Sequence, residues 1–361
     1  MNEVMFKQQK MIRWLAFVLF GVLALLGHGK AYAAPTCNSP IPSSFTFAVP
    51  TGSYGIPRDV PVGTVLTPWT AWQSSATSLW ACDYQSGVYI GAALKALIGG
   101  KSVKVIGVTT GVGSSFPAYP TGVPGVGLIV QTTTNVGNGG TVSRVQPLYS
   151  SWQAPLSQIW YADGPGFTAG FSMKFAFVKT GPMTSGTTMP FGAFASGGVD
   201  NAPPANPVGI VSVNLTGVAT FNVLACTTPD VLVDLGTQRD TLFTGVGSTS
   251  PAVSFNIKLN SCPAGMNTVQ YSIAPTTTVV DSSQSVVALD ASSNATGVGV
   301  QLLNSDGVTA LPLSSNLLFS SYSGATGGDY AIPLKARYYQ TGSSVGAGRA
   351  NTSMVFTMTY L

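Results

Sequence analysis

The stretch RANTSMVFTMTYL, residues 349–361, is the most strand-like segment of the sequence. Its large apolar side chains fall on every second position, with smaller residues between them: Met354, Phe356, Met358 and Tyr360. A period of two is typical of a β-strand with one buried face. We therefore expect a half-buried strand that runs to the last residue of the sequence without a polar tail.

The opposite end has the features of an export signal. Basic residues between positions 7 and 13 precede an apolar run at 14–26, and the small-residue sequence AYA ends at Ala33. This order predicts a secretory signal peptide at 1–33, cleaved after Ala33. A membrane anchor is the alternative, but the apolar run is shorter than the roughly 20 residues that a spanning helix needs. We expect an exported, soluble chain.

Few charged residues remain once that segment is removed. It contains the only histidine, His28, and the only glutamate, Glu3. It also carries four of the 16 basic and one of the 12 acidic residues, so the net charge falls from +4 to about +1. Such a balance does not indicate a nucleic-acid partner, which requires a strongly basic face. Without histidine, a catalytic triad lacks its usual base and a His-ligated zinc site is excluded.

Four cysteines remain in the exported chain: Cys37, Cys82, Cys226 and Cys262. An even number in this compartment predicts two disulfides, for which three pairings are possible. Two cysteines lie near the start and two lie after residue 220, which favours the pairs 37–82 and 226–262. A zinc site is the rival, but no Cys-x-x-Cys spacing is present.

The rest of the sequence predicts an all-β fold in two β-sandwich domains. Short β-branched runs are separated by Gly, Pro and Asn turns, and no long helical period occurs. Residues 181–207 read as a long loop. The seven short strands after Cys226, together with a disulfide, predict an immunoglobulin-like sandwich. We place the first domain at 34–220 and the second at 221–361, with the boundary near Leu224.

The second half resembles the pilin domain of chaperone–usher fimbrial subunits. The resemblance is carried by VDLG (233–236), Cys262, GVGVQLLN (297–304), PLKARYYQTG (333–342) and the closing segment from Gly346, with a penultimate tyrosine. Within that segment Gly348 lies thirteen residues before the end. The family's pilin domain is an immunoglobulin-like sandwich that lacks its last strand, so the resemblance implies an incomplete sandwich here.

The resemblance also implies partners. A periplasmic chaperone would lend a strand to the open groove, and the adjacent fimbrial subunit would replace it after passage through an outer-membrane usher. Met354, Phe356, Met358 and Tyr360 would lie along this groove, and basic chaperone residues would anchor the Leu361 carboxylate. An ordinary internal strand of a closed sandwich is the alternative.

Position in the fibre follows from the short sequence APT between the expected cleavage site and Cys37. Three residues span at most roughly 10 Å, which is too short for a groove-filling donor strand. We expect a subunit that accepts a strand without donating one, and such a subunit belongs at the fimbrial tip on the cell surface.

The first half resembles the receptor-binding domain of two-domain fimbrial adhesins, which implies a host glycan or extracellular-matrix protein as its receptor. In mannose-binding members, polar residues shortly after the second cysteine contact the sugar, and Asp83 and Tyr84 match that position. The family's later binding loop, rich in amides and carboxylates, has no counterpart here. Collagen and other glycans therefore remain open, as does a structural tip subunit that caps or initiates the fimbria without a receptor.

Aromatic residues suggest further receptor contacts, because sugar sites combine an aromatic face with a few oriented polar groups. The candidates are Trp69, Trp72, Trp152, Trp160, Tyr161 and Asp163. The alternatives are tryptophans of the sandwich core and, for Asp163, a turn residue.

Catalysis is not expected. The first domain has four carboxylates: Asp59, Asp83, Asp163 and Asp200. None lies in a recognisable catalytic pattern, and neither Glu nor His is available as a general acid. The stretch 290–294 lacks the carboxylates of a calcium loop, so neither a metal nor another cofactor is expected.

Overall fold

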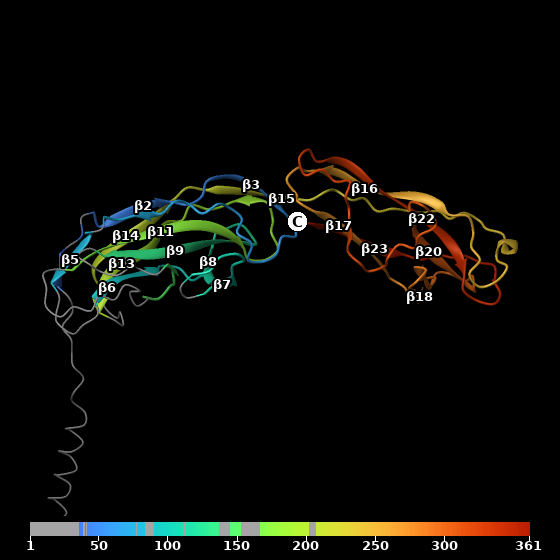
Figure 1. The fold of residues 1–361 in the computed structure, drawn as a ribbon, viewed down its shortest axis with the longest axis horizontal. Coiled ribbons are helices and arrows are strands. Elements are labelled where there is room, and N and C mark those ends of the chain that lie inside the picture. Colours follow the sequence, from blue (N-terminus) through green and yellow to red (C-terminus); the bar gives the residue numbers. More distant parts are fainter. Residues whose placement is uncertain are drawn as a thin grey trace, which may run out of the picture.

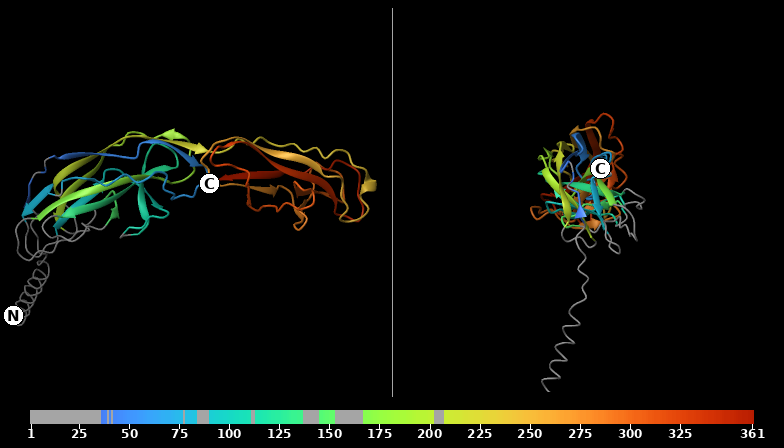
Figure 2. Two further views of the ribbon diagram at one scale, coloured as in Figure 1. Left: turned by 45° about the horizontal axis from the view of Figure 1, so that its top comes forward. Right: turned by 90° about the vertical axis from the view of Figure 1, so that its left-hand side faces the viewer.

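Two β-rich domains lie end to end in the computed structural model, and the C-terminus of the chain lies at their junction (Figures 1 and 2). The structure describes residues 36–38, 40, 42–76, 78–83, 90–110, 113–136, 145–152, 167–201 and 207–361. Within these ranges the one helical element is a 3-10 turn, η1, at Asp240–Leu242. No helix in the described part of the chain is long and apolar enough to cross a membrane.

The first domain contains three sheets. The largest has eight strands: β1 (Thr36–Cys37), β5 (Trp80–Asp83), β11 (Phe167–Lys179), β9 (Val126–Val136), β8 (Ser115–Pro120) and β7 (Lys101–Lys104), with β4 (Gln73–Ser74) beside β11 and β10 (Gln146–Pro147) beside β9. The second consists of β2 (Ser44–Ala48), β14 (Val208–Thr216), β13 (Gly192–Asn201) and β6 (Ile90–Ala96). The third consists of β12 (Gly186–Thr187), β15 (Ala219–Leu224) and β3 (Gly52–Pro57).

Strand β11 shows how the sequence builds this domain. Its odd positions from Phe171 to Phe177 belong to the main core, whereas Ala176 and Val178 belong to a smaller cluster on the opposite face. Successive side chains of a strand point to opposite faces, so a strand covered on both faces is apolar throughout. The central strand of the large sheet is therefore buried on two sides.

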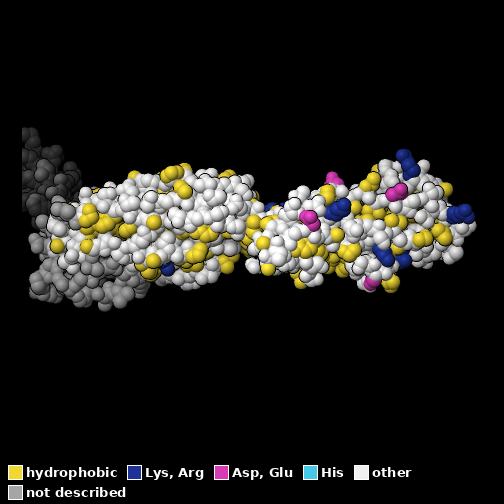
Figure 3. Space-filling model, turned by 90° about the horizontal axis from the view of Figure 1, so that it is seen from above, with side chains coloured by type: hydrophobic (Ala, Val, Ile, Leu, Met, Phe, Trp, Pro, Cys, Tyr) yellow, Lys and Arg dark blue, Asp and Glu magenta, His cyan; other side chains and the backbone are white. Residues whose placement is uncertain are grey.

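The second domain is a sandwich of two sheets. One contains β16 (Val253–Cys262), β22 (Gly328–Gln340), β20 (Val298–Asn304), β19 (Val286–Val287) and β18 (Val279–Asp281). The other contains β21 (Leu317–Leu318), β17 (Val269–Pro275) and β23 (Met354–Tyr360). The core between them shares no residue with the cores of the first domain. On the face in Figure 3, hydrophobic side chains lie exposed along this domain between charged ones.

The predicted all-β fold in two domains is confirmed. The expected long loop at 181–207 is wrong, because β12 and all of β13 lie within it. Strand β13 is rich in glycine and alanine, which are depleted in strands, so its sequence gives a weak signal. Tight packing requires these small residues: a Cβ at Gly197 would lie 2.9 Å from Leu94 Cδ2.

Candidate functional site: an open strand edge in the second domain

Strand β23 pairs with β17 on one side only. Leu361 and Thr268 exchange two backbone hydrogen bonds just beyond the strand, with N···O distances of 2.9 Å each. Bonded positions alternate in an antiparallel ladder, so the odd-numbered residues of β23 face β17. The even-numbered residues direct their N–H and C=O groups to the other side, where no strand lies among the described residues.

An extended segment at 229–237, the edge segment, faces this open side across a groove. Just before this segment, Thr227 forms an isolated bridge with Asn260 of β16. Beyond Thr227 the chain runs away from β16, and the segment is assigned to no sheet. Its side chains alternate: Leu235 is buried, whereas Leu232 is 97% exposed. The edge segment is thus a second extended edge without a strand partner in the described part of the chain.

A cavity of about 640 Å³ lies between these two edges. Its floor is apolar and comes from both sheets: Phe255, Ile257, Ile273, Val300, Leu302 and Ala336. Residues 230–235 form one wall, and residues 350–354 with Phe356 form the other. Unpaired backbone groups on both sides of an apolar floor match the needs of one additional strand with alternating apolar side chains.

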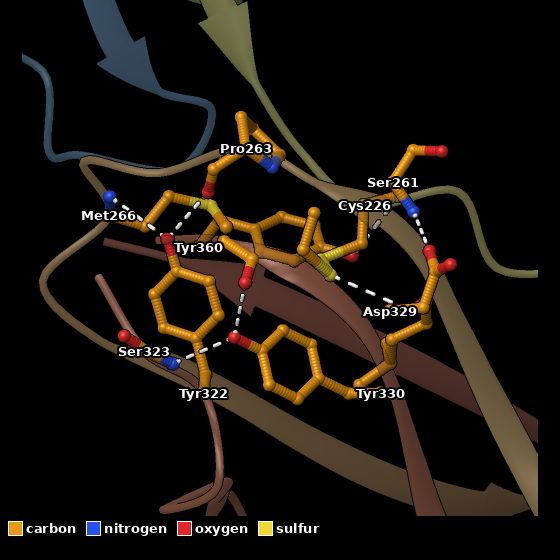
Figure 4. The surroundings of a disulfide bond; sticks show 12 residues. Cys226, Ser261, Pro263, Met266, Tyr322, Ser323, Asp329, Tyr330 and Tyr360 are labelled. Atoms are coloured by element: carbon orange, nitrogen blue, oxygen red, sulfur yellow. Dashed lines mark hydrogen bonds between the residues drawn. A yellow bond between two sulfur atoms is a disulfide. The ribbon is translucent and has the colours of Figure 1, made fainter. Parts of the chain in front are cut away.

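The residues expected along the groove divide into two groups. Met354 and Phe356 line the cavity. Met358 and Tyr360 are buried closer to the junction and do not line it. The Tyr360 hydroxyl donates to the Cys226 carbonyl oxygen at 3.4 Å (Figure 4), and burial raises the pKa of Tyr360. The Leu361 oxygen accepts from the backbone N–H groups of residues 267 and 268.

Gly348 shapes the turn that leads into β23. Its φ is +157°, and a Cβ there would lie 2.5 Å from Asn294 Oδ1 and 2.6 Å from the Ala295 nitrogen. The same Asn294 oxygen accepts from the Arg349 N–H at 2.6 Å. Only glycine allows this close approach, which holds the wall at 350–354 beside the cavity.

The structure joins Cys37 to Cys82 and Cys226 to Cys262, the pairs that the sequence favoured. The first disulfide links β1 to β5. The second links the chain just before the edge segment to the end of β16, close to Tyr360 (Figure 4). It therefore fixes the point from which the edge segment departs.

The first-domain candidates fall in different places. Trp69 and Trp72 flank Lys174 of β11, whose Nζ lies 5.1 and 4.9 Å from the two ring centroids. Trp69 also packs against Phe116, whereas Trp72 is 39% exposed. Burial lowers the pKa of Lys174. Trp152 instead lies under Lys95 Nζ, 4.9 Å from its ring centroid.

The other candidates give less information. Asp83 is the last residue of β5. Tyr84, Trp160, Tyr161 and Asp163 lie outside the described residues.

Two residues at the domain junction were not anticipated. Arg58 and Asp59 follow β3 in the first domain, yet they bind the end of β23 in the second. They are 300 and 301 residues away in sequence from their partners, Met358 and Tyr360. No local pattern distinguishes them from an ordinary charged turn after a proline.

Comparisons with known proteins show the family of the second half of the chain. Residues 222–361 match the family described as "Fimbrial protein". The type-1 fimbrial protein A chain of Escherichia coli K12 is 37% identical over 134 residues, which cover 36% of this chain and 71% of that protein. A "Fimbria adhesin protein" of Klebsiella pneumoniae is 24% identical over 354 residues, covering 95% of this chain and 98% of that one.

Among solved structures, the CupB6 tip adhesin from Pseudomonas aeruginosa aligns with 90% of this chain and 93% of its own, at 17% identity and a TM-score of 0.34. The family match and the type-1 relative confirm the resemblance seen in the sequence. The chain belongs to the fimbrial protein family.

Proposed function

We propose that this protein is a fimbrial tip adhesin with one assembly domain and one receptor-binding domain. The second domain, 221–361, accepts a strand from the periplasmic chaperone and then, after engaging the outer-membrane usher, from the adjacent subunit. The first domain, 34–220, binds a host glycan or a matrix protein. The observation that carries the assembly role is the apolar cavity between two edges that lack a strand partner.

Physical chemistry explains why a strand is the expected occupant. Backbone N–H and C=O groups in an apolar setting need partners, and a neighbouring strand supplies them in register. Each large apolar side chain that fills the cavity adds about 1.5–3 kcal/mol. A strand with alternating apolar residues satisfies both needs at once, whereas a compact ligand satisfies only the second.

The assembly role is tested by fusing a strand of alternating apolar residues after Leu361 through a flexible linker. We expect the fused protein to be a soluble monomer when it is expressed without a chaperone, and the unfused protein to aggregate or be degraded. The control strand has the same composition with its alternation shifted by one position, which turns its apolar residues away from the cavity. A stable, soluble monomer without any added strand would contradict the proposal.

The receptor role is supported by similarity to a fimbria adhesin along nearly the whole chain. The pair of tryptophans around Lys174 supplies an aromatic surface with an adjacent donor, which suits a sugar or a protein loop.

The position of the subunit at the fimbrial tip is part of the same proposal. Strand β1 includes Thr36 in the first domain's sheet, so the expected cleavage after Ala33 would leave two residues before that sheet, too few for a donor strand.

The receptor role is tested with the strand-fused protein on glycan and extracellular-matrix arrays. We expect binding to at least one receptor, and about five- to thirtyfold weaker binding in Trp72→Ala, because an aromatic contact contributes about 1–2 kcal/mol. Lys101→Ala, an exposed lysine on β7, is the control and should bind like the parent. Absence of binding together with normal fibre assembly would favour the structural tip subunit instead.

A further inference from the structure

Three of the outward-facing backbone groups at the end of β23 already have partners, and the first domain supplies them. The Asp59 N–H donates to the Tyr360 carbonyl oxygen at 3.0 Å, and the Tyr360 N–H donates to Asp59 Oδ2 at 2.9 Å. Arg58 Nη2 donates to the Met358 carbonyl oxygen at 2.5 Å. These are groups that an incoming strand would otherwise bind.

We infer that Arg58 and Asp59 close one end of the strand-accepting edge from within the same chain. An incoming strand then pairs with β23 at Met354 and Phe356 and reaches no further than the Met358 N–H. This inference rests on the proposed function, since it specifies where the partner strand must stop. We call the Arg58–Asp59 pair the clasp.

The cavity supports the same limit. Its lining includes Met354 and Phe356 but neither Met358 nor Tyr360. The Arg58 guanidinium lies over the Tyr360 ring, 4.9 Å from its centroid, and so covers the side chain next in line. The apolar lining of the cavity ends at Phe356, and the free backbone groups of β23 end at the Met358 N–H.

The first domain holds the clasp in place through several contacts. Val60 N–H donates to the Pro57 oxygen at 3.4 Å and closes the turn. Arg58 N–H donates to the Leu224 oxygen at 3.1 Å. Lys179 is 5% exposed, and its Nζ donates to the Arg58 oxygen at 2.6 Å. A backbone fixed at three points presents its side chains to β23 in one geometry.

The charges of the clasp are matched. Arg58 and Asp59 form an ion pair at 3.0 Å. Burial raises the pKa of Asp59, but hydrogen bonds from Arg58 and the Tyr360 N–H, with the charges of Arg58 and Lys179, outweigh it and hold the pKa below its ordinary value. Asp59 is therefore a carboxylate at neutral pH and accepts from Tyr360 as a charged group. A competing strand must replace that bond with a neutral one, which is weaker.

The test uses the full chain with a fused strand in two lengths. The short strand is designed to pair at Met354 and Phe356, and the long strand continues the alternation by two residues. In the parent background we expect both fusions to unfold at the same temperature. We also expect the Tyr360 amide to exchange slowly in both.

In Arg58→Ala/Asp59→Ala we expect the short-strand fusion to lose Tyr360 protection by about tenfold, because a hydrogen bond to a charged group is removed. The variant frees the Met358 carbonyl oxygen and the Tyr360 N–H, whereas the backbone N–H of residue 59 still binds the Tyr360 carbonyl oxygen. The long strand should bind the two freed groups, restore the protection of the Tyr360 amide and raise the unfolding temperature. Arg239→Ala/Asp240→Ala is the control, since it removes another adjacent Arg–Asp pair whose side chains are exposed. This control should behave like the parent.

The clasp is overturned if the long strand stabilises the parent as much as the variant, or if Tyr360 exchange does not change in the variant. The amides of Met354 and Phe356 report separately on the proposed function. If neither strand protects them, strand acceptance itself is refuted, whatever Tyr360 does.

Discussion

Gly348 and Gly245 have the same backbone φ of +157° but different surroundings. A Cβ at Gly348 would lie within 2.8 Å of three atoms of residues 294 and 295, whereas a Cβ at Gly245 would meet nothing within 4 Å. The comparison separates the strain of the backbone conformation from the cost of steric contact. It also tests whether the turn before β23 depends on close approach to Asn294.

We predict that Gly348→Ala destabilises the strand-fused protein more than Gly245→Ala does. Both substitutions carry about 1 kcal/mol of backbone strain, and Gly348→Ala adds about 1–3 kcal/mol from overpacking. Urea unfolding followed by circular dichroism measures the difference. Equal losses for the two variants would show that Asn294 moves aside and that the close approach is not required.

The sequence predicts the role of a single residue only when that residue belongs to a recognisable pattern. Gly348 was identifiable because it stands at a fixed distance from an alternating strand in a known family. Arg58 and Asp59 were not, because their roles depend on partners about 300 residues away that share no pattern with them. The disulfides were partly predictable, because the positions of the four cysteines in the chain favoured one of the three possible pairings.

Strand β23 was predictable as an element because its alternation is strict and one face is buried. What the sequence did not reveal is that its open side is bordered by the edge segment, which has a strand-like pattern but pairs with no sheet. A period of two reports which side chains face inward and says nothing about where the backbone groups bond. The groove is a property of missing pairings, which leave no pattern in the residues themselves, so only the family resemblance predicted it and only the structure shows which segments border it.

Strand β13 shows the opposite failure. Its ten residues are mostly small, so the segment reads as a loop, yet it pairs with both β14 and β6. Two register shifts against β14 interrupt its alternation. Packing against Leu94 and Trp80 selects glycine at position 197 over a better strand former. Local propensity is overridden here by contact with large core side chains.

At the scale of the whole molecule, two separate cores are joined by few contacts. The clasp connects the domains through three hydrogen bonds to Met358 and Tyr360. A hydrogen bond contributes about 0.5–1.5 kcal/mol, or about 1.5–3 kcal/mol when one partner is charged. Three such bonds are few beside the many buried side chains of either core, each of which contributes about 1.5–3 kcal/mol. The two domains should therefore unfold in separate transitions.

The distribution of tryptophan makes these transitions distinguishable. All six tryptophans precede residue 161, so the second domain contains none. Trp80 is fully buried in the first domain's core and donates to the Gly209 oxygen at 2.6 Å. Tryptophan emission therefore reports on the first domain alone, whereas circular dichroism reports on the strands of both.

We predict that weakening the fused strand moves only one transition. Replacing two of its apolar residues by serine should destabilise the second domain by about 2–5 kcal/mol for each residue. Circular dichroism should show the unfolding transition of the second domain shifted to a lower midpoint. The unfolding transition of the first domain, followed by tryptophan emission, should stay in place. A polar-face substitution in the same strand is the control and should move neither. If both signals shift together, the junction transmits far more energy than its contacts provide, and the domains form one cooperative unit.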